Sequence, residues 1–252
     1  MSKVALVIPA RMGSTRLARK ALADIEGQPM VVRVAERAAL VKGVSRVIVA
    51  TDSAEIVEAC KKGGFEARLT PENCASGTER VAFVAKDLTE DVVVNLQGDE
   101  PVMNPLSVEA AMEPVLKRGS LMGSAYTFFR SWDEVVSPSN VKVIVDKNGD
   151  AVFFSRYAIP YRQNAVPDGE ITRDPFFGKH MGIYVYQRDF LLNYSSLEVP
   201  LMERCESLEQ LRALHHGVKI GMGRTNFGAQ SVDTAEDLEL ARGIFRSQRD
   251  GR

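Results

Sequence analysis

The chain has few of the residues that build disulfide frameworks, zinc sites or membrane spans. Its 252 residues include three cysteines and three histidines. Cys60, Cys74 and Cys205 are widely spaced and odd in number, which fits neither a disulfide framework nor a zinc-ligand pattern, so we expect reduced thiols. No apolar run approaches the length of a transmembrane helix, and residues 4–8 form too short a run for a signal peptide. We therefore expect a cytoplasmic protein with no membrane partner.

The chain also lacks an excess of charge of one sign. It has 32 Lys+Arg against 33 Asp+Glu, a formal net charge of -1. A chain balanced in this way has no general attraction for nucleic acid, so we expect no nucleic-acid partner, and any anion site has to be local. The two best-known phosphate loops, G-x-x-x-x-G-K-[ST] and G-x-G-x-x-G, are missing too.

Short β-branched runs alternate with amphipathic stretches along the first half. Strands are predicted at 4–8, 46–50, 91–96 and 122–129, and helices at 30–40, 54–62, 78–87 and 105–117. This order predicts an α/β fold with a predominantly parallel central sheet and helices on both faces. The second half is predicted to contain a hairpin at 140–155, a loop at 160–175, a strand at 180–186 and helices at 207–216 and from about 235. We expect one domain, 1–252, in which 140–186 is an inserted hairpin and dimerisation region.

The loop after the first predicted strand reads "PARMGSTR" and carries most of the local positive charge. In open α/β sheets this loop is the usual place for a phosphate group. Gly13 and Ser14 allow backbone N–H groups to approach an anion, and Arg11, Arg16 and Lys20 supply charge-assisted hydrogen bonds. The alternative interpretation is a solvated basic loop.

Two carboxylates stand out at strand and helix ends. Asp99 lies in "NLQGDEP", directly after a predicted parallel strand, where a hard cation such as Mg²⁺ is held beside a phosphate, although a solvated turn is the alternative. Asp233 lies outside the capping box of "TAED", which leaves its carboxylate unexplained. In "SGTER", Ser76 and Glu79 form a second capping box, and Arg80 falls on the first helical turn, where a cation is unfavourable unless an anion is near. His180 is either a core histidine or a substrate contact.

These motifs, in this order, resemble the 3-deoxy-manno-octulosonate (Kdo) cytidylyltransferases, also called CMP-Kdo synthetases. The resemblance covers nearly the whole chain, through "IPARMGSTRLARKALADIEGQPM", "ATD", "SGTER", "NLQGDEP", "NVKVIVDKNGDAVFFSRYAIPY", "KHMGIYVY", "ESLEQLRAL" and "VDTAEDLE". It implies a Rossmann-like nucleotidyltransferase fold, a homodimer and Mg²⁺ as cofactor. It also implies a reaction in which the anomeric hydroxyl of Kdo attacks the α-phosphate of CTP, pyrophosphate leaves, and CMP-Kdo is formed for lipopolysaccharide assembly.

The resemblance implies a role for each candidate residue. The expected catalytic residues are Lys20, Asp99 and Asp233, with both aspartates as metal ligands. The expected CTP contacts are Pro9, Arg11, Ser14, Thr15, Arg16, Lys20, Asp52, Ser76, Gly77, Thr78 and Gln97. The expected sugar contacts are Arg80, Gln97, Arg156, His180, Tyr184, Glu209 and Gln210, of which Arg80 and Arg156 are the candidates to receive the sugar carboxylate.

The chain departs from the family pattern I-P-A-R-x-x-S-T-R-L-P-x-K-P-L at two prolines. Ala18 and Ala21 stand in their places, so the loop loses two fixed φ angles and we expect it to be less preorganised. A changed substrate is the first alternative: 8-amino-Kdo or another nonulosonate such as sialic acid. The second is a nucleotide-binding module without turnover, against which the two retained aspartates argue.

Overall fold

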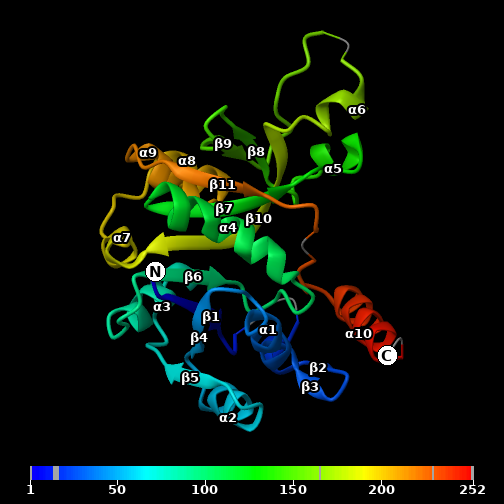
Figure 1. Cartoon of the computed structure of the whole chain (residues 1–252). Helices are drawn as coiled ribbons and strands as arrows, with labels where there is room; N and C mark the ends of the chain where they lie inside the picture. The colour runs from blue at the N-terminus through cyan, green and yellow to red at the C-terminus, as the bar shows by residue number, and fades with distance from the viewer. Residues whose placement is uncertain (1, 14–16, 165, 229, 251–252) are drawn as a thin grey trace. The chain divides into compact units, whose positions relative to one another are not determined.

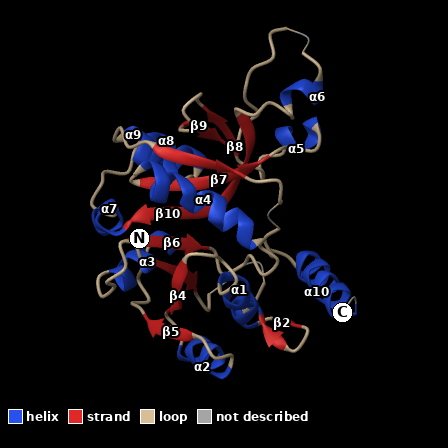
Figure 2. Ribbon diagram, viewed as in Figure 1, coloured by secondary structure: helices blue, strands red, loops and turns tan. Residues whose placement is uncertain are grey.

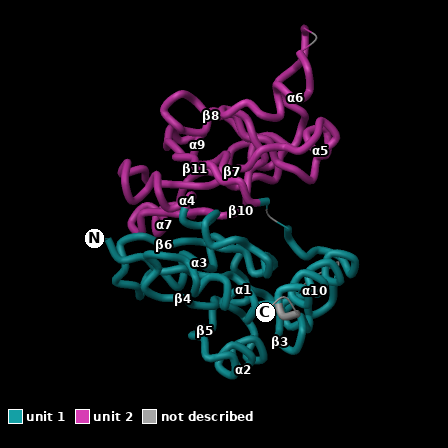
Figure 3. Tube along the Cα trace, turned by 45° about the vertical axis from the view of Figure 1, so that its right-hand side comes forward, with its two compact units in different colours: residues 1–109, 228–252 teal, residues 110–227 magenta. Residues whose placement is uncertain are grey.

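The structure is a computed structural model that describes residues 2–13, 17–164, 166–228 and 230–250. Its contacts divide the chain into two compact units, Met1–Glu109 with Gly228–Arg252, and Ala110–Phe227 (Figure 3). The second unit is therefore inserted in sequence between two parts of the first. The chain passes from one to the other within helix α4 (Pro105–Arg118). The expectation of one domain over 1–252 stays a prediction.

The first unit is built on parallel strands. Their spatial order is β6 (Val92–Leu96), β1 (Val4–Ala10), β4 (Val44–Thr51) and β5 (Glu66–Leu69), and each neighbouring pair is parallel. Every residue of β1 and of β6 is buried, which explains why these runs are apolar rather than alternating. The helices of this unit are α1 (Met30–Ala38), α2 (Ala54–Lys62), α3 (Gly77–Ala85) and α10 (Ala235–Asp250) (Figure 1).

The strand order of this sheet places two loops together. Chain order runs from β1 outward to β4 and β5, and then returns to β6 on the other side of β1. Ligands of open α/β sheets bind at such a reversal, outside the carboxyl ends of the strands. Gly98, after β6, is required here because an added Cβ would lie 2.8 Å from the Pro9 carbonyl oxygen. The loop after β1 and the turn that holds Asp99 are thus neighbours.

A short segment lies between the loop after β1 and the start of α1. It contains the single-turn helix η1 (Lys20–Leu22) and the small hairpin of β2 (Asp24–Ile25) and β3 (Gln28–Pro29). Ile25 and Met30 form a buried cluster with Val232, Leu238 and Ala241. This apolar cluster holds α10 beside β2, as Figure 1 shows, so residues near 233 return to the segment around residue 20.

The second unit has a mixed sheet (Figure 2). Strand β10 (Phe177–Gln187) is antiparallel to β7 (Met122–Thr127) and to β8 (Lys142–Val145), and β11 (Ile220–Arg224) is parallel to β7. The predicted hairpin is confirmed as β8 paired with β9 (Ala151–Ser155). The remaining helices are α5 (Trp132–Val136), α6 (Asp168–Ile171), α7 (Arg188–Tyr194), α8 (Leu201–Glu206) and α9 (Gln210–His215).

The predicted α/β class, with a mostly parallel sheet flanked by helices, is confirmed. Two strands of the large sheet, β5 and β11, were not predicted, and neither was the small hairpin of β2 and β3. The β5 segment is short and charged, and β11, "IGMGR", is rich in glycine, which has a low strand propensity. The glycine at 223 is nevertheless needed, because a Cβ there would lie 1.9 Å from the Ala110 carbonyl oxygen of α4. The predicted loop at 160–175 was wrong in part, since it contains α6.

Two further observations concern the whole described chain. The three cysteines are free, as expected. Among the described residues, no helix combines the length and the apolar character that crossing a membrane requires.

Candidate active site

Lys20 lies between two carboxylates that come from distant parts of the sequence. Its Nζ donates to Asp99 Oδ2 at 2.7 Å and to Asp233 Oδ1 at 2.8 Å. The Val232 backbone N–H donates to the Asp99 carbonyl at 2.9 Å, which joins the turn after β6 to the segment before α10. All three belong to the first unit, and the lysine side chain is 14% exposed. The three residues predicted to be catalytic are therefore brought together.

The charges of this group determine what it can hold. Burial alone lowers the pKa of Lys20, but Asp99 and Asp233 outweigh it, so its pKa lies above the ordinary 10.5 and the ammonium stays protonated. Two carboxylate oxygens that converge on one cation also suit Mg²⁺, which takes one or two carboxylates together with phosphate oxygens and water. Within the described ranges, no group of three or more acidic, histidine or cysteine side chains is arranged so that it could hold a metal ion by itself. The donor set thus fits a metal that is shared with a phosphate ligand.

The helix that follows Asp233 is capped by Thr234 and Asp237. Thr234 Oγ1 accepts from the Asp237 N–H at 3.2 Å, and Asp237 Oδ2 accepts from the backbone N–H groups of Asp233 and Thr234 at 3.0 and 2.9 Å. These backbone hydrogen bonds lower the pKa of Asp237. The predicted capping box is confirmed, and the Asp233 carboxylate lies outside it.

The start of α3 lies against the carboxyl ends of β1 and β6. Ser76 Oγ accepts from the Glu79 N–H at 3.3 Å, as predicted for a helix cap, while the Glu79 carboxylate accepts at 2.6 Å from the N–H of Ala75, one residue before the cap, rather than from that of Ser76. A Cβ on Gly77 would lie 3.3 Å from Pro9 Cγ and 3.6 Å from Gln97 Oε1. Four of the predicted CTP contacts, Pro9, Ser76, Gly77 and Gln97, are thus grouped.

Asn95 belongs to this group and was not predicted. It is fully buried in β6, where its Nδ2 donates to Thr78 Oγ1 at 3.4 Å and its Oδ1 accepts from Gln97 Nε2 at 3.2 Å. It therefore fixes the orientation of two predicted CTP contacts. The signal in the sequence was one amide within the apolar run "VVVNL", because a buried polar group needs partners.

Arg80 and Asp52 form a buried ion pair. Arg80 is 3% exposed, and its Nη2 lies 3.0 Å from Asp52 Oδ2. Its Nη1 donates to the Pro71 carbonyl at 3.3 Å and to Thr70 Oγ1. Asp52 Oδ1 accepts from the Met12 N–H at 3.2 Å. Arg80 is a cation on the first turn of α3, where it needs a nearby anion. Asp52 is that anion.

The loop after β1 is described in part. Arg11 and Gly13 are exposed, while Ser14, Thr15 and Arg16 lie outside the described residues. Arg19 precedes η1 in the left-handed region, with a φ of 54°, and its guanidinium pairs with Glu55 of α2 rather than with the carboxylates around Lys20. Arg19 and Lys20 are adjacent and carry the same charge, yet they have different partners.

The predicted sugar contacts other than Arg80 and Gln97 lie in the second unit. The Tyr184 hydroxyl donates to Gln210 Oε1 at 3.0 Å, and the rings of Tyr184 and His180 lie 5.5 Å apart. Gln210 is 1% exposed, and its Nε2 has no hydrogen-bond partner among the described residues. A buried donor without a partner is unfavourable unless a ligand or a water molecule supplies one. Glu209, beside it, is partly buried, and its carbonyl accepts from the Tyr194 hydroxyl at 2.5 Å.

His180 is held as a neutral ring. Its Nε2 lies 2.9 Å from Ser124 Oγ, and its ring packs edge-on against Phe154 at 4.9 Å. Burial lowers the pKa of His180 to about 3, so it is uncharged at neutral pH. Burial also raises the pKa of Tyr184, which therefore keeps its proton. These two side chains offer hydrogen bonds but no charge.

Arg156 supplies positive charge in the second unit. Its Nε donates to the Glu206 carbonyl at 2.8 Å, and its Nη1 and Nη2 lie 3.3 and 3.5 Å from the carbonyls of Pro138 and Ser207. Within the described part of the chain no carboxylate forms an ion pair with this guanidinium. The buried Lys142 ammonium donates to the Arg156 carbonyl at 2.5 Å and fixes the backbone there. Among the described residues the Arg156 guanidinium is thus held by carbonyl oxygens, whereas that of Arg80 pairs with a carboxylate.

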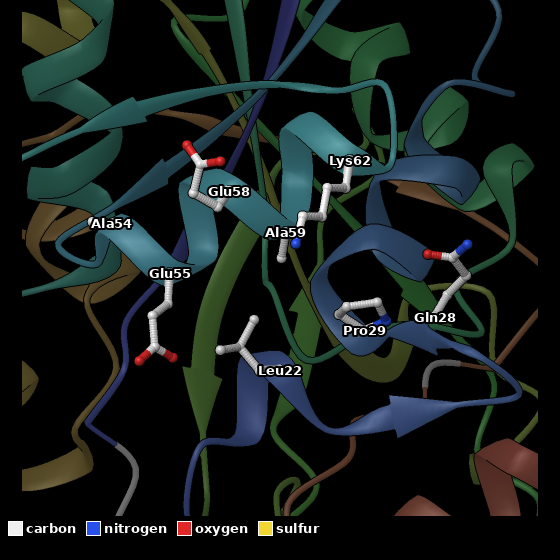
Figure 4. A pocket seen from close by; sticks show the side chains of 8 residues that line it. All are labelled: Leu22, Gln28, Pro29, Ala54, Glu55, Glu58, Ala59 and Lys62. Carbon is white, nitrogen blue, oxygen red and sulfur yellow. The ribbon is translucent and has the colours of Figure 1, made fainter.

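A separate pocket of 620 Å³ lies in the first unit between η1, β3 and α2 (Figure 4). Its lining residues are Leu22, Gln28, Pro29, Ala54, Glu55, Glu58, Ala59 and Lys62. None of the predicted site residues lines it. It shares η1 with Lys20, but the lysine reaches Asp99 and Asp233 instead.

Comparisons with known proteins show that the chain is similar to cytidylyltransferases. A model of the cytidylyltransferase family matches residues 5–220. A 3-deoxy-manno-octulosonate cytidylyltransferase of Solibacter usitatus is 43% identical over 246 residues, which are 97% of this chain and 95% of that protein. The enzyme of the same name from Neisseria gonorrhoeae is 42% identical over 253 residues, 98% of this chain and 100% of that protein.

Solved structures of cytidylyltransferases are also similar to this chain. A CMP:2-keto-3-deoxy-manno-octonic acid synthetase complexed with CTP has 39% sequence identity and a TM-score of 0.90, and the match covers 98% of this chain and 100% of that one. A cytidylyltransferase from Leptospira borgpetersenii, at 18% identity and a TM-score of 0.62, shares the fold, over 98% of this chain and 88% of its own. The chain belongs to the cytidylyltransferase family, and within it to the 3-deoxy-manno-octulosonate cytidylyltransferases.

Proposed function

We propose that this protein transfers CMP from CTP to the anomeric hydroxyl of Kdo and releases pyrophosphate. A bond forms between the anomeric oxygen and the α-phosphorus, and the bond from that phosphorus to the β-phosphate oxygen breaks. The product, CMP-Kdo, is the activated sugar for lipopolysaccharide assembly. The observation that carries this proposal is the convergence of Lys20, Asp99 and Asp233 at the carboxyl ends of parallel strands.

The first unit provides the nucleotide side. Negative charge on the non-bridging oxygens and on the departing pyrophosphate has to be stabilised, and positioned cations provide most of that effect. Lys20 provides one such cation, because its ammonium is protonated and fixed by two acceptors. Asp99 and Asp233 would hold Mg²⁺, which supplies further neutralising charge when bound. The group formed by Pro9, Ser76, Gly77, Thr78 and Gln97 would hold the rest of CTP.

The second unit provides most of the sugar side. Kdo carries a carboxylate beside its reacting hydroxyl, and the Arg156 guanidinium, which lacks a carboxylate partner in the described chain, suits that anion. The unpaired Nε2 of Gln210 suits a sugar oxygen. Tyr184 and His180, both uncharged, suit hydroxyl groups, and Glu209 is the remaining candidate acceptor.

Pyrophosphate release tests the proposal. Purified protein with CTP and Mg²⁺ should release pyrophosphate when Kdo is added, and less with 8-amino-Kdo or sialic acid. Faster release with one of those sugars would assign the enzyme to that sugar. Binding of CTP without pyrophosphate release for any acid sugar would mean that the chain is a nucleotide-binding module.

A homodimer and a cytoplasmic location complete the proposal. The region 140–186 is the candidate dimer contact, supported by Val152 of β9, which is 56% exposed, and by the exposed Tyr157 and Tyr161. A mass near the 27.7 kDa of one chain, measured by light scattering at micromolar concentration, would contradict the dimer.

A further inference from the structure

Arg80 joins the carboxyl ends of two strands in the first unit. It projects from the first turn of α3 and donates to Thr70 and Pro71, which follow β5, and to Asp52, which follows β4. The Thr70 N–H donates in turn to the Thr51 carbonyl at 2.8 Å. Its two terminal nitrogens thus have protein acceptors, and its side chain is 4% exposed, so a ligand has little access to it.

Asp52 extends this connection to the loop after β1. One of its carboxylate oxygens accepts from Arg80 at 3.0 Å, and the other accepts from the Met12 N–H at 3.2 Å. Met12 lies two residues after the end of β1, within the segment that leads to Lys20. The loop proposed to bind the triphosphate is therefore attached to α3 through one carboxylate.

The charges explain why the two residues occur as a pair. A lone carboxylate beside a triphosphate site would repel the nucleotide, and a lone buried guanidinium would lack a counterion. Together they are neutral, and Asp52 keeps a free oxygen with which to fix the Met12 backbone. An ionised carboxylate only accepts hydrogen bonds, so it cannot bind phosphate oxygens directly.

We infer that Arg80 and Asp52 are positioning residues that fix the triphosphate loop through the Met12 N–H, and that Arg80 does not receive the acid sugar. Of the two candidates for the sugar carboxylate, Arg80 and Arg156, this inference keeps Arg156. The inference rests on the proposed function, because it takes the loop after β1 to bind CTP.

The affinity for CTP and the KM values for CTP and Kdo distinguish the role of Arg80 and Asp52 from that of Arg156. Asp52→Asn and Arg80→Met should each weaken CTP binding, measured by calorimetry without sugar, by about tenfold, because the first removes the charge of the acceptor and the second removes the side chain that orients it. The KM for Kdo should change by less than about twofold. Arg156→Ala should do the reverse and raise the KM for Kdo while CTP binding is unchanged. The double variant should bind CTP no more weakly than the worse single variant, because both residues act through one contact.

Arg212→Met is the matched control, because it breaks a buried ion pair with Glu203 in the second unit. It should lower the unfolding temperature and leave CTP binding unchanged. If Arg80→Met does not fold, Arg80→Lys takes its place beside Asp52→Asn. Unchanged CTP binding in Asp52→Asn and the Arg80 variant, or a raised KM for Kdo in the Arg80 variant, would overturn the inference. Absence of pyrophosphate release from the wild-type protein would overturn the proposed function alone, since CTP binding is measured without turnover.

Discussion

The Lys20 ammonium and the Asp99 carboxylate lie 2.7 Å apart although 79 residues separate them in the sequence. The contact joins the segment that follows the loop after β1 to the turn after β6, two strands that are neighbours in the sheet. A lysine in this position holds a positive charge where the sheet topology favours a phosphate ligand. The first two predictions follow from this contact.

Removing either carboxylate should abolish most turnover. Asp99→Asn and Asp233→Asn each delete one anionic oxygen of the proposed metal pair, and each should lower the rate by roughly 10²-fold or more. Both side chains are about one-third exposed, at 31% and 30%, so the variants should fold. Calorimetric titration with Mg²⁺ and CTP should show weaker metal binding. A variant with a near wild-type rate at saturating Mg²⁺ would remove that residue from the metal site.

Lys20→Met should lower turnover by about 10²-fold or more, because it keeps most of the side-chain length and deletes the charge. Arg19→Met is the control in the adjacent position, since Arg19 pairs with Glu55 and not with the two aspartates. Steady-state kinetics should therefore show a large loss at residue 20 and a small one at residue 19. Equal losses at both positions would mean that the charge of the loop acts diffusely.

Arg156→Ala should change the response to substrate charge. A site built around a carboxylate should reject neutral sugars by roughly 10³-fold or more, because its guanidinium would be left without an anion. The wild-type protein should therefore ignore hexoses and hexose 1-phosphates, and the variant should lose most of its preference for acid sugars. Turnover of a hexose 1-phosphate at a rate comparable to that of Kdo would place the substrate outside the acid sugars.

His180 should make stability depend on pH below neutrality. Its pKa of about 3 in the folded protein lies below the ordinary 6.5, so the unfolded chain binds a proton more readily between these values. The contribution of the neutral His180 ring to the free energy of unfolding is complete above pH 6.5 and is lost as the pH falls toward 3. Between pH 7 and pH 4 the unfolding temperature should fall further in the wild type than in His180→Phe, which has no titrating ring. Parallel curves for the two proteins would mean that His180 is protonated in the folded state.

Much of the first unit could be predicted because its signals are local. The apolar runs of β1 and β6, the helical spacing of α1 and α2, and the helix caps at Ser76 and Thr234 are all visible within a few residues. The prediction that Asp233 lies outside a capping box also needed only its neighbours. The class of fold followed from the order of these elements.

The contacts that depend on sheet order could not be predicted in the same way. The position of Arg80 indicated that it required an anion, but only the neighbouring ends of β4 and β5 show that the anion is Asp52. Strand β11 was missed because its glycines are selected for close approach to α4, and not for strand propensity. The connection from Asn95 to Gln97 and Thr78 likewise required knowledge of which side chains face one another.

The insertion of residues 110–227 into the first unit sets the order in which the parts of the charged group around Lys20 are synthesised. A ribosome that has released the first 109 residues has delivered Lys20 and Asp99, while Asp233 is still to be translated, 213 residues after Lys20. The partners of Ile25 and Met30, namely Val232, Leu238 and Ala241, are also missing at that stage. The nascent chain therefore has one carboxylate for the lysine and an uncovered apolar surface. It gains the complete charged group of Lys20, Asp99 and Asp233 only after the inserted unit has been synthesised.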